Sequence, residues 1–271
     1  MPRPTIPTLM FAATLALAGC GGGSNTTGGA GAGGSTGAGG STGGNPYLAK
    51  YSFFVVSVDA VKRIAGTQNG LGGDLTHGET GAGAGLRGAD KICAEVAENA
   101  MPGAGSKAWR AFLSATTGGA GGGPIHAKDR IGAGPWYDAL GRQVASNVAQ
   151  LIMERPADAD LAIKNDLPNE FGVPNGTDGA NNHAVLTGTG PDGMLYAVAT
   201  PTTDSTCNDW TSKAASGKPW CGHSWPRQGS GANWMSAIAV GGCDPCVGSG
   251  TACVGSTGGY GGFYCFVTNQ P

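Results

Sequence analysis

An apolar stripe with helical spacing runs through residues 86–100. Small apolar side chains recur there at intervals of three and four residues, with charged side chains between them. This period predicts an amphipathic helix with one face on a core and the other in water. The stripe consists of Ala89, Ile92, Cys93, Val96, Ala97 and Ala100, and the polar face of Asp90, Lys91, Glu95 and Glu98.

Short runs rich in β-branched and aromatic residues predict strands. The run at 136–144 predicts two short strands joined by a turn near Leu140-Gly141. The turn-forming segment 190–193 separates the runs at 184–187 and 195–198. The strands that we expect lie within 51–58, 109–114, 136–144, 184–187 and 195–198.

The segment from Glu154 to Asn182 is rich in Asp and Asn and shows no regular period. We expect a long irregular loop. A loop of this length is either functional or merely tolerated.

The first twenty residues have the features of an export signal. A single positive charge at Arg3 precedes an apolar run from Leu9 to Ala18 that is too short to span a membrane. Leu17-Ala18-Gly19-Cys20 resembles the lipobox of bacterial lipoprotein precursors. We therefore expect residues 1–19 to be a signal peptide and Cys20 to be a lipidated N-terminus, with an ordinary secretory signal as the alternative.

A glycine-rich segment follows Cys20. Residues 21–45 contain 13 glycines among Ser, Thr, Ala and Asn. Such a composition cannot bury a core and predicts a flexible tether over 20–46 with a reach of roughly 25 to 30 Å. Gly21 stands where an acidic residue often retains a lipoprotein in the inner membrane, so we expect anchoring in the outer membrane.

The remaining chain, 47–271, has a size that one domain can fill. All 18 acidic residues and every Lys or Arg except Arg3 lie after the tether, which leaves a net charge of about −3 there. The sequence shows no basic stripe for a nucleic acid or a sulfated polysaccharide, so neither is expected as a partner.

Seven cysteines remain beside Cys20, six of them between residues 207 and 265. An oxidising compartment favours disulfides, and an odd number leaves one thiol over. The sequence does not decide which of Cys221, Cys243 and Cys246 is unpaired. Cys243-Asp244-Pro245-Cys246 also matches a redox or zinc pattern, but neither a βαβ context nor four nearby ligands accompany it.

Four motifs carry a resemblance to a known family. Their order is that of a bacterial lipoprotein domain family of unknown function, which in turn is similar to the endostatin domain of collagens. The resemblance covers residues from about 51 to 271. The motifs are Gly88-Ala89-Asp90 with Cys93, Trp109 to Ser114, Thr206 to Ser212, and Phe263-Tyr264-Cys265-Phe266.

The resemblance implies the fold class that we expect. This is an α+β, C-type-lectin-like domain with a mixed, mainly antiparallel sheet, few helices, long loops and stabilising disulfides. It also implies two nested disulfides, Cys93 to Cys265 and Cys207 to Cys253. The heparin affinity of endostatin depends on arginine clusters that the sequence does not reproduce, and we do not expect it.

Sugar-binding lectins of this fold use calcium, so calcium is the metal to consider. Such lectins bind calcium through a Glu-Pro-Asn or Gln-Pro-Asp triplet and a Trp-Asn-Asp triplet. Leu167-Pro168-Asn169-Glu170 and Asn208-Asp209-Trp210 resemble these triplets in composition but differ from them in order. The alternative, which we expect, is that these residues satisfy loop backbone and hold no metal or other cofactor. The calcium candidates are Asp166, Asn169, Glu170, Asp178, Asn208 and Asp209.

Two further motifs point to other chemistry. Gly83-Ala84-Gly85-Leu86-Arg87-Gly88 matches a dinucleotide signature, but no strand leads directly into it. Gly222-His223-Ser224 resembles the start of a hydrolase nucleophile elbow, but Pro226 replaces its last glycine. We expect a polar surface loop there.

We therefore expect an envelope lipoprotein, displayed on the surface or facing the periplasm, whose domain binds a glycan or a protein without catalysis. One alternative is a serine hydrolase that uses Ser224 and His223. The other is a purely structural or adhesive module.

Overall fold

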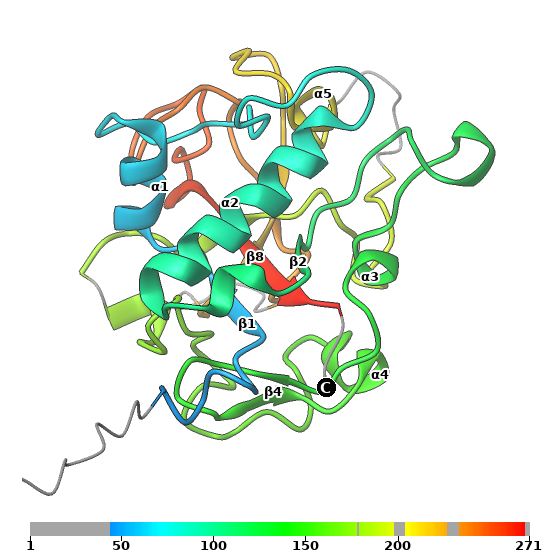
Figure 1. The fold of residues 1–271 in the computed structure, drawn as a ribbon. Helices are drawn as coiled ribbons and strands as arrows, with labels where there is room; N and C mark the ends of the chain where they lie inside the picture. The colour runs from blue at the N-terminus through cyan, green and yellow to red at the C-terminus, as the bar shows by residue number, and fades with distance from the viewer. Residues whose placement is uncertain (1–43, 178, 198–203, 227–232, 269–271) are drawn as a thin grey trace, which may run out of the picture. The chain divides into compact units, whose positions relative to one another are not determined.

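Strand β8 lies at the centre of the domain (Figure 1). The computed structural model describes residues 44–177, 179–197, 204–226 and 233–268, and all nine residues of β8 are buried. The main sheet has the order β1-β8-β5-β6-β7, and β2 also pairs with β8. Its pairs are antiparallel except β5 with β8, so the sheet is mixed and mainly antiparallel, as expected. The strands are β1 (Phe53–Val55), β2 (Trp109–Ala111), β5 (Ala184–Leu186), β6 (Trp220–His223), β7 (Ile238–Ala239) and β8 (Gly259–Val267), with β3 (Trp136–Tyr137) and β4 (Gln143–Ala145) in a separate pair.

Side chains of β8 alternate between two apolar cores. Phe263 and Cys265 belong to the core that includes the apolar stripe of α2, whereas Tyr264 and Phe266 belong to the core under the β3–β4 pair. This alternation is the period of two that a strand imposes on its side chains. Because both faces are covered, the strand is apolar or glycine along most of its length.

The long amphipathic helix is confirmed as α2 (Ala84–Ala100), which crosses the sheet in front of β8 in Figure 1. Its residues Ile92, Cys93 and Val96 are fully buried. Pro102 lies two residues after the end of the helix and disfavours helical conformation in Met101, the residue before it. The other helices are α1 (Val58–Ala65), α3 (Ala127–Arg130), α4 (Val148–Leu151) and α5 (Cys207–Trp210).

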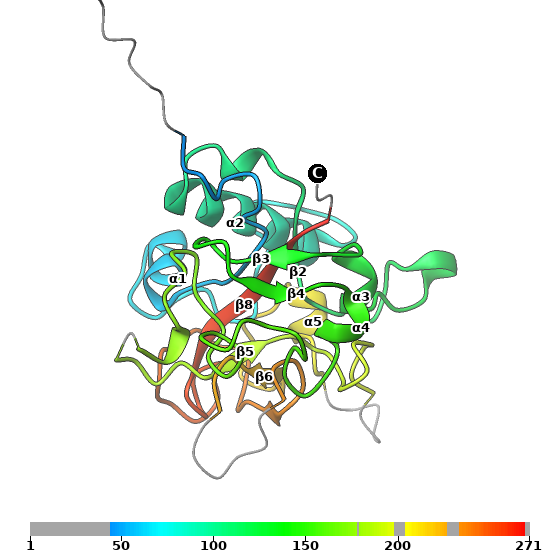
Figure 2. The ribbon, with the colours of Figure 1, turned by 90° about the horizontal axis from the view of Figure 1, so that it is seen from below.

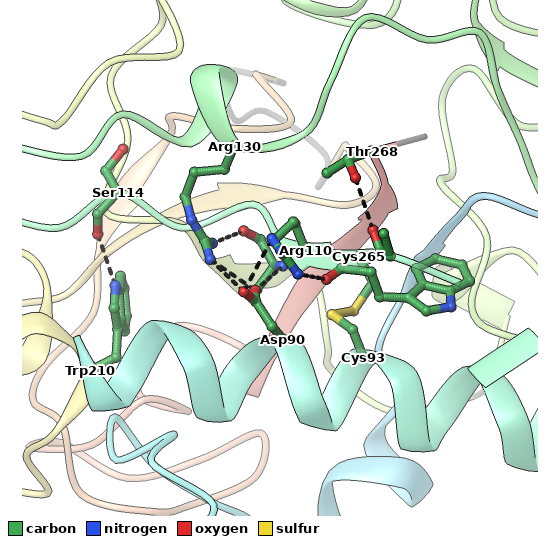
Figure 3. A network of polar contacts seen from close by, with 11 residues as sticks. Asp90, Cys93, Arg110, Ser114, Arg130, Trp210, Cys265 and Thr268 are labelled. Carbon is green, nitrogen blue, oxygen red and sulfur yellow. Dashed lines mark hydrogen bonds and ion pairs between the residues drawn. A yellow bond between two sulfur atoms is a disulfide. The ribbon is translucent and has the colours of Figure 1, made fainter. Parts of the chain in front are cut away.

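One residue of the expected polar face of α2 points into the protein. The Asp90 carboxylate accepts hydrogen bonds from Arg130 Nη2 at 2.8 and 2.9 Å and from the Ala111 backbone N–H at 2.9 Å (Figure 3). Burial raises the pKa of Asp90 although Arg130 opposes the shift. The carboxylate therefore joins α2, β2 and α3.

The Cys93–Cys265 disulfide is confirmed and ties α2 to β8, with the two Cα atoms 5.6 Å apart (Figure 3). The expected Cys207–Cys253 disulfide is wrong, because Cys207 is bonded to Cys243 and Cys253 to Cys246. The physical reason is a contact between distant segments. The Cys243 N–H donates to the Ala214 carbonyl, and Ala214 follows shortly after α5, so residue 243 lies beside that helix.

The two cysteines of the C-x-x-C motif therefore belong to different disulfides, and the motif is neither a redox pair nor a zinc ligand pair. Cys221 is the free cysteine among the described residues, and it is fully buried in β6. Burial raises the pKa of its thiol. A buried thiol of this kind is inert in the folded state.

The strand expected over 51–58 is shorter than its apolar run. It ends at Val55, and Ser57 caps the unforeseen helix α1 by accepting a hydrogen bond from the Ala60 N–H at 3.1 Å. Val58 and Val61 of α1 are buried. The sequence hides this boundary because the β-branched run continues into the first turn of the helix.

Two other strand expectations and one loop expectation change. The run at 109–114 forms a strand only over β2. In the run at 195–198, Leu195 forms an isolated bridge with Thr189, and Val198 lies outside the described residues. Near Cys221, where we expected a surface loop, the chain forms the buried strand β6. A side chain at Gly222 would collide with the backbone of residues 234–235, so the strand can approach this segment only with glycine at that position.

The described residues form one compact unit. The signal peptide, Cys20 and most of the tether expected from the sequence lie outside the described residues. Within the described part of the chain, no helix is both long and apolar enough to cross a membrane. The Lys107 ammonium donates to the carbonyls of Leu48, Ala49 and Tyr51, which fixes the first turn of the domain.

Candidate functional site

The calcium candidates of the 154–182 loop bond to their own loop or to α1. The Asp166 carboxylate accepts from the Gly176 N–H at 2.9 Å. Asn169 Oδ1 accepts from the N–H groups of Phe171 and Val173 at 3.0 and 3.1 Å. The candidate Asp178 lies outside the described residues.

The other two candidates, Asn208 and Asp209, belong to α5, which is a turn of left-handed helix. All four of its residues have positive φ, between 51° and 65°. Asp209 accepts hydrogen bonds from the backbone and hydroxyl groups of Thr116 and Thr117, at 2.6 to 3.2 Å. Its carboxylate therefore stabilises a strained turn.

The structure does not bring the calcium candidates together. Glu170 bonds to the start of α1, whereas Asp209 bonds to the 116–117 segment. Among the described residues, no group of three or more His, Cys, Asp or Glu side chains is placed to hold a metal ion. Asp166 and Asn169 do accept from loop backbone, whereas Asn208 donates to the Thr211 hydroxyl and Glu170 and Asp209 accept from both backbone and hydroxyl groups.

Ser224 and His223 both contact His183, and the Ser224 N–H donates to the His183 carbonyl at 2.9 Å. The buried Ser224 hydroxyl accepts from Asn175 Nδ2 at 2.8 Å. The His223 ring packs edge-on against His183, with centroids 4.7 Å apart. A nucleophilic serine needs a base that can take its proton, and the Asn175 amide, which donates to the Ser224 oxygen, is not such a base.

The glycines of the dinucleotide-like motif serve packing. A side chain at Gly85 would lie 2.2 Å from the Asp209 carbonyl oxygen, and one at Gly88 would lie 2.1 Å from those of Leu75 and Thr76. These two glycines therefore let α2 approach the backbone of two neighbouring segments.

A tight turn at residues 168–173 forms one wall of the candidate site. Asn169 closes it, because its N–H donates to the Val173 carbonyl at 2.8 Å and its side chain caps the turn. Arg142 donates to the Gly172 carbonyl. Gly172 has a φ of 76° and lies against Leu140, where a Cβ would be 2.6 Å from Cγ. These contacts fix the turn from both sides.

Glu170 joins this turn to α1. Its carboxylate accepts from the Ser57 N–H at 3.0 Å and the Ser57 hydroxyl at 2.6 Å. Tyr51 donates its hydroxyl to the Glu170 carbonyl at 3.0 Å. Burial raises the pKa of the Glu170 carboxyl, and the bonds from Ser57 oppose that shift only in part.

A hollow of about 350 Å³ lies between the turn and the start of α1. This volume is at the lower end of the range for small-molecule sites. Figures 1 and 2 both show α1 at the edge of the molecule, beside the yellow-green segment that contains the turn. The hollow is lined by Ser57, Asp59, Lys62, Asn169, Phe171 and Ala180, among others.

Three side chains of the hollow are available to a ligand. Phe171 is 50% exposed on its fixed turn. Asp59 and the half-buried Lys62 form no ion pair or side-chain hydrogen bond within the described residues. An aromatic face beside one donor and one acceptor is the composition of a polar-ligand site.

A second hollow, of about 380 Å³, gathers basic side chains that are dispersed in the sequence. Lys107 is bonded to three carbonyls there, and Arg87 and Lys91 pair with Glu79. Arg110 also lines it, 3.6 Å from Asp90. The fold therefore does form a basic cluster, which the sequence did not indicate, but most of its donors are already used.

The candidates named from the sequence include Asn169, which lines the hollow, and Glu170, which bonds to Ser57 beside it. Asp59 and Lys62 were missed because α1 was not foreseen. Phe171 carried a usable signal, since it is a large apolar residue within a polar segment.

Comparison with protein-family models gives no match, and no curated protein matches this chain at a significant level.

Proposed function

We propose that this protein is an envelope lipoprotein, anchored through Cys20 in the outer membrane, whose C-type-lectin-like domain binds a glycan or a protein ligand without catalysis. The ligand lies in the hollow between α1 and the 168–173 turn. The anchor part of the proposal rests on the lipobox-like residues Leu17 to Cys20 and the glycine-rich tether.

One observation carries the binding site: the fixed turn presents a half-exposed Phe171 beside Asp59 and Lys62, whose charged groups are unused within the described residues. Binding sites need such preorganised groups, because ordering them during association costs affinity. The second, basic hollow lacks this property, since Lys107 and Arg87 are bonded within the protein.

The proposal of a lectin-like fold is supported by the disulfide that ties α2 to the last strand, as the family resemblance implies. The pairing of Cys207 with Cys243 departs from the implied pattern. The fold proposal therefore rests on the first disulfide and on the mixed sheet around β8.

The test of binding is an array of glycans and proteins probed with residues 21–271, which lack the anchor. We expect at least one ligand whose signal is lost in Phe171→Ala and kept in Leu161→Ala. Leu161 is a matched control because it is 88% exposed and does not line the hollow. Mass spectrometry should recover the ligand unchanged, whereas hydrolysis that disappears in Ser224→Ala would overturn the non-catalytic assignment.

The anchor has its own test in cells. Wild type should incorporate a fatty-acid probe and partition into detergent, and Cys20→Ala should do neither. Equal labelling of the two proteins would contradict lipidation at Cys20.

A further inference from the structure

The hollow beside Phe171 is the first of three neighbouring hollows along α1. Asp59 and Lys62 line both this hollow and a middle hollow of about 470 Å³, which is distinct from the basic hollow described above. Thr67 lines both the middle hollow and a third, of about 290 Å³, which reaches Lys213. Figure 1 shows α1 between the yellow-green segment with the turn and the cyan segment that follows the helix. We call the three hollows together the α1 groove.

The α1 groove carries charges of both signs. Asp59 and Asp74 supply carboxylates, Lys62 and Lys213 supply ammonium groups, and Arg63 supplies a guanidinium group that lies 3.6 Å from Glu95. Lys213 lies 4.0 Å from Asp74 and is 53% exposed. A polyanion or a polycation would meet repulsion along such a surface, whereas hydroxyl and amide groups can use both donors and acceptors.

The shape and the apolar content of the α1 groove also restrict the ligand. A protein partner typically inserts several large apolar side chains into a well-packed centre. Of the residues that line the three hollows, Phe171 is the large aromatic side chain and stands at one end, and the His77 imidazole lines the hollow at the other end. A row of small hollows with mixed polar and apolar lining and a stacking platform at one end suits a chain of sugar rings, which present polar edges and apolar faces.

We infer that the α1 groove binds an oligosaccharide chain, with one sugar ring against Phe171 and further rings continuing along α1 towards Lys213. This inference rests on the proposed binding function and selects the glycan from its two ligand classes. The hydroxyl groups of successive rings bond to Asp59 and Lys62 and then to the residues of the third hollow.

The test uses size-graded oligomers of glucose, mannose and N-acetylglucosamine, of one to six units, titrated into residues 21–271. For at least one sugar, affinity should rise with length until the groove is filled and then level off. Phe171→Ala should weaken binding of every length about tenfold, a typical effect for an anchoring aromatic side chain.

Lys213→Ala should weaken the hexamer about fivefold and leave the dimer unchanged, because only a long chain reaches the third hollow. Lys164→Ala, which removes a half-buried lysine that donates to the Ala157 carbonyl and lines none of the three hollows, should change neither. Equal affinity for all lengths, or a hexamer insensitive to Lys213→Ala, would overturn the continuous groove.

The inference and the proposed function fail separately. If no hexamer binds but the array gives a protein ligand that is lost in Phe171→Ala, the oligosaccharide assignment is wrong and the binding function stands. If neither the hexamers nor the array gives a ligand that depends on Phe171, both are wrong.

Discussion

The buried carboxylate of Glu170 accepts two hydrogen bonds from Ser57, one from its backbone N–H at 3.0 Å and one from its hydroxyl at 2.6 Å. The two residues are 113 positions apart in the chain. Their contact joins the turn that presents Phe171 to the helix that presents Asp59 and Lys62. The proposed site therefore depends on this pair, although neither residue needs to touch the ligand.

This pair predicts a pH dependence of stability. Burial raises the pKa of Glu170 in the folded protein, so the native state holds its proton to higher pH than the unfolded chain does. The contribution of Glu170 to the free energy of unfolding should fall as the pH rises from its ordinary pKa to its raised one. Glu170→Gln, which resembles the protonated form, should lose this part of the dependence.

The measurement is urea unfolding of wild type and Glu170→Gln between about pH 4 and pH 8, near and above the ordinary pKa of a glutamate. The stability of the variant relative to wild type should grow with pH. Because Asp90 also titrates with a pKa raised by burial, the difference between the two proteins is the relevant quantity. A difference that is constant or shrinks with pH would contradict the assignment.

The disulfides should contribute unequally to stability. In the chain-entropy model, the Cys93–Cys265 disulfide, with a sequence separation of 172, is worth about 5 kcal/mol, and the Cys246–Cys253 disulfide, with a separation of 7, about 2 kcal/mol. Replacing the first pair by alanine should therefore lower the free energy of unfolding by about 3 kcal/mol more than replacing the second. Equal losses in denaturant unfolding would refute this ranking, and non-reducing peptide mapping tests the pairing itself.

The left-handed turn of α5 predicts an unusual response to glycine. Asn208 has a φ of 54° and is exposed. Alanine disfavours this conformation by roughly 1 kcal/mol, whereas glycine adopts it without a steric cost. Asn208→Ala should therefore be less stable than Asn208→Gly by about 1 kcal/mol in chemical denaturation. The reverse order, which is the rule in ordinary helices, would show that the turn is not left-handed in solution.

Local patterns in the sequence were enough to predict α2 and the two strands of the β3–β4 pair, and the tie between Cys93 and Cys265 was predicted from the family resemblance. The helical stripe was long, and the family resemblance supplied the disulfide partner. Helix α1 was missed because it begins within a β-branched run and has only eight residues. Its start depends on the Ser57 cap rather than on a long periodic pattern.

The rest of the site depends on contacts between distant residues. Cys207 and Cys243 meet because the 214–217 segment folds back, which no spacing rule shows. Glu170 reaches Ser57 beside the hollow, whereas from the sequence it was considered only as a calcium candidate. Polar residues in a loop have the same appearance in sequence whether they hold an ion, a turn or another element.

The central claim is that the hollow beside Phe171 is a binding site, and the most direct measurement is the dissociation constant of the strongest array ligand. We predict that Phe171→Ala weakens it at least about tenfold, which is about 1.4 kcal/mol, while Leu161→Ala leaves it within about twofold. Circular dichroism should show that both variants are folded. Equal affinity of wild type and Phe171→Ala, or a larger loss in Leu161→Ala, would contradict the account.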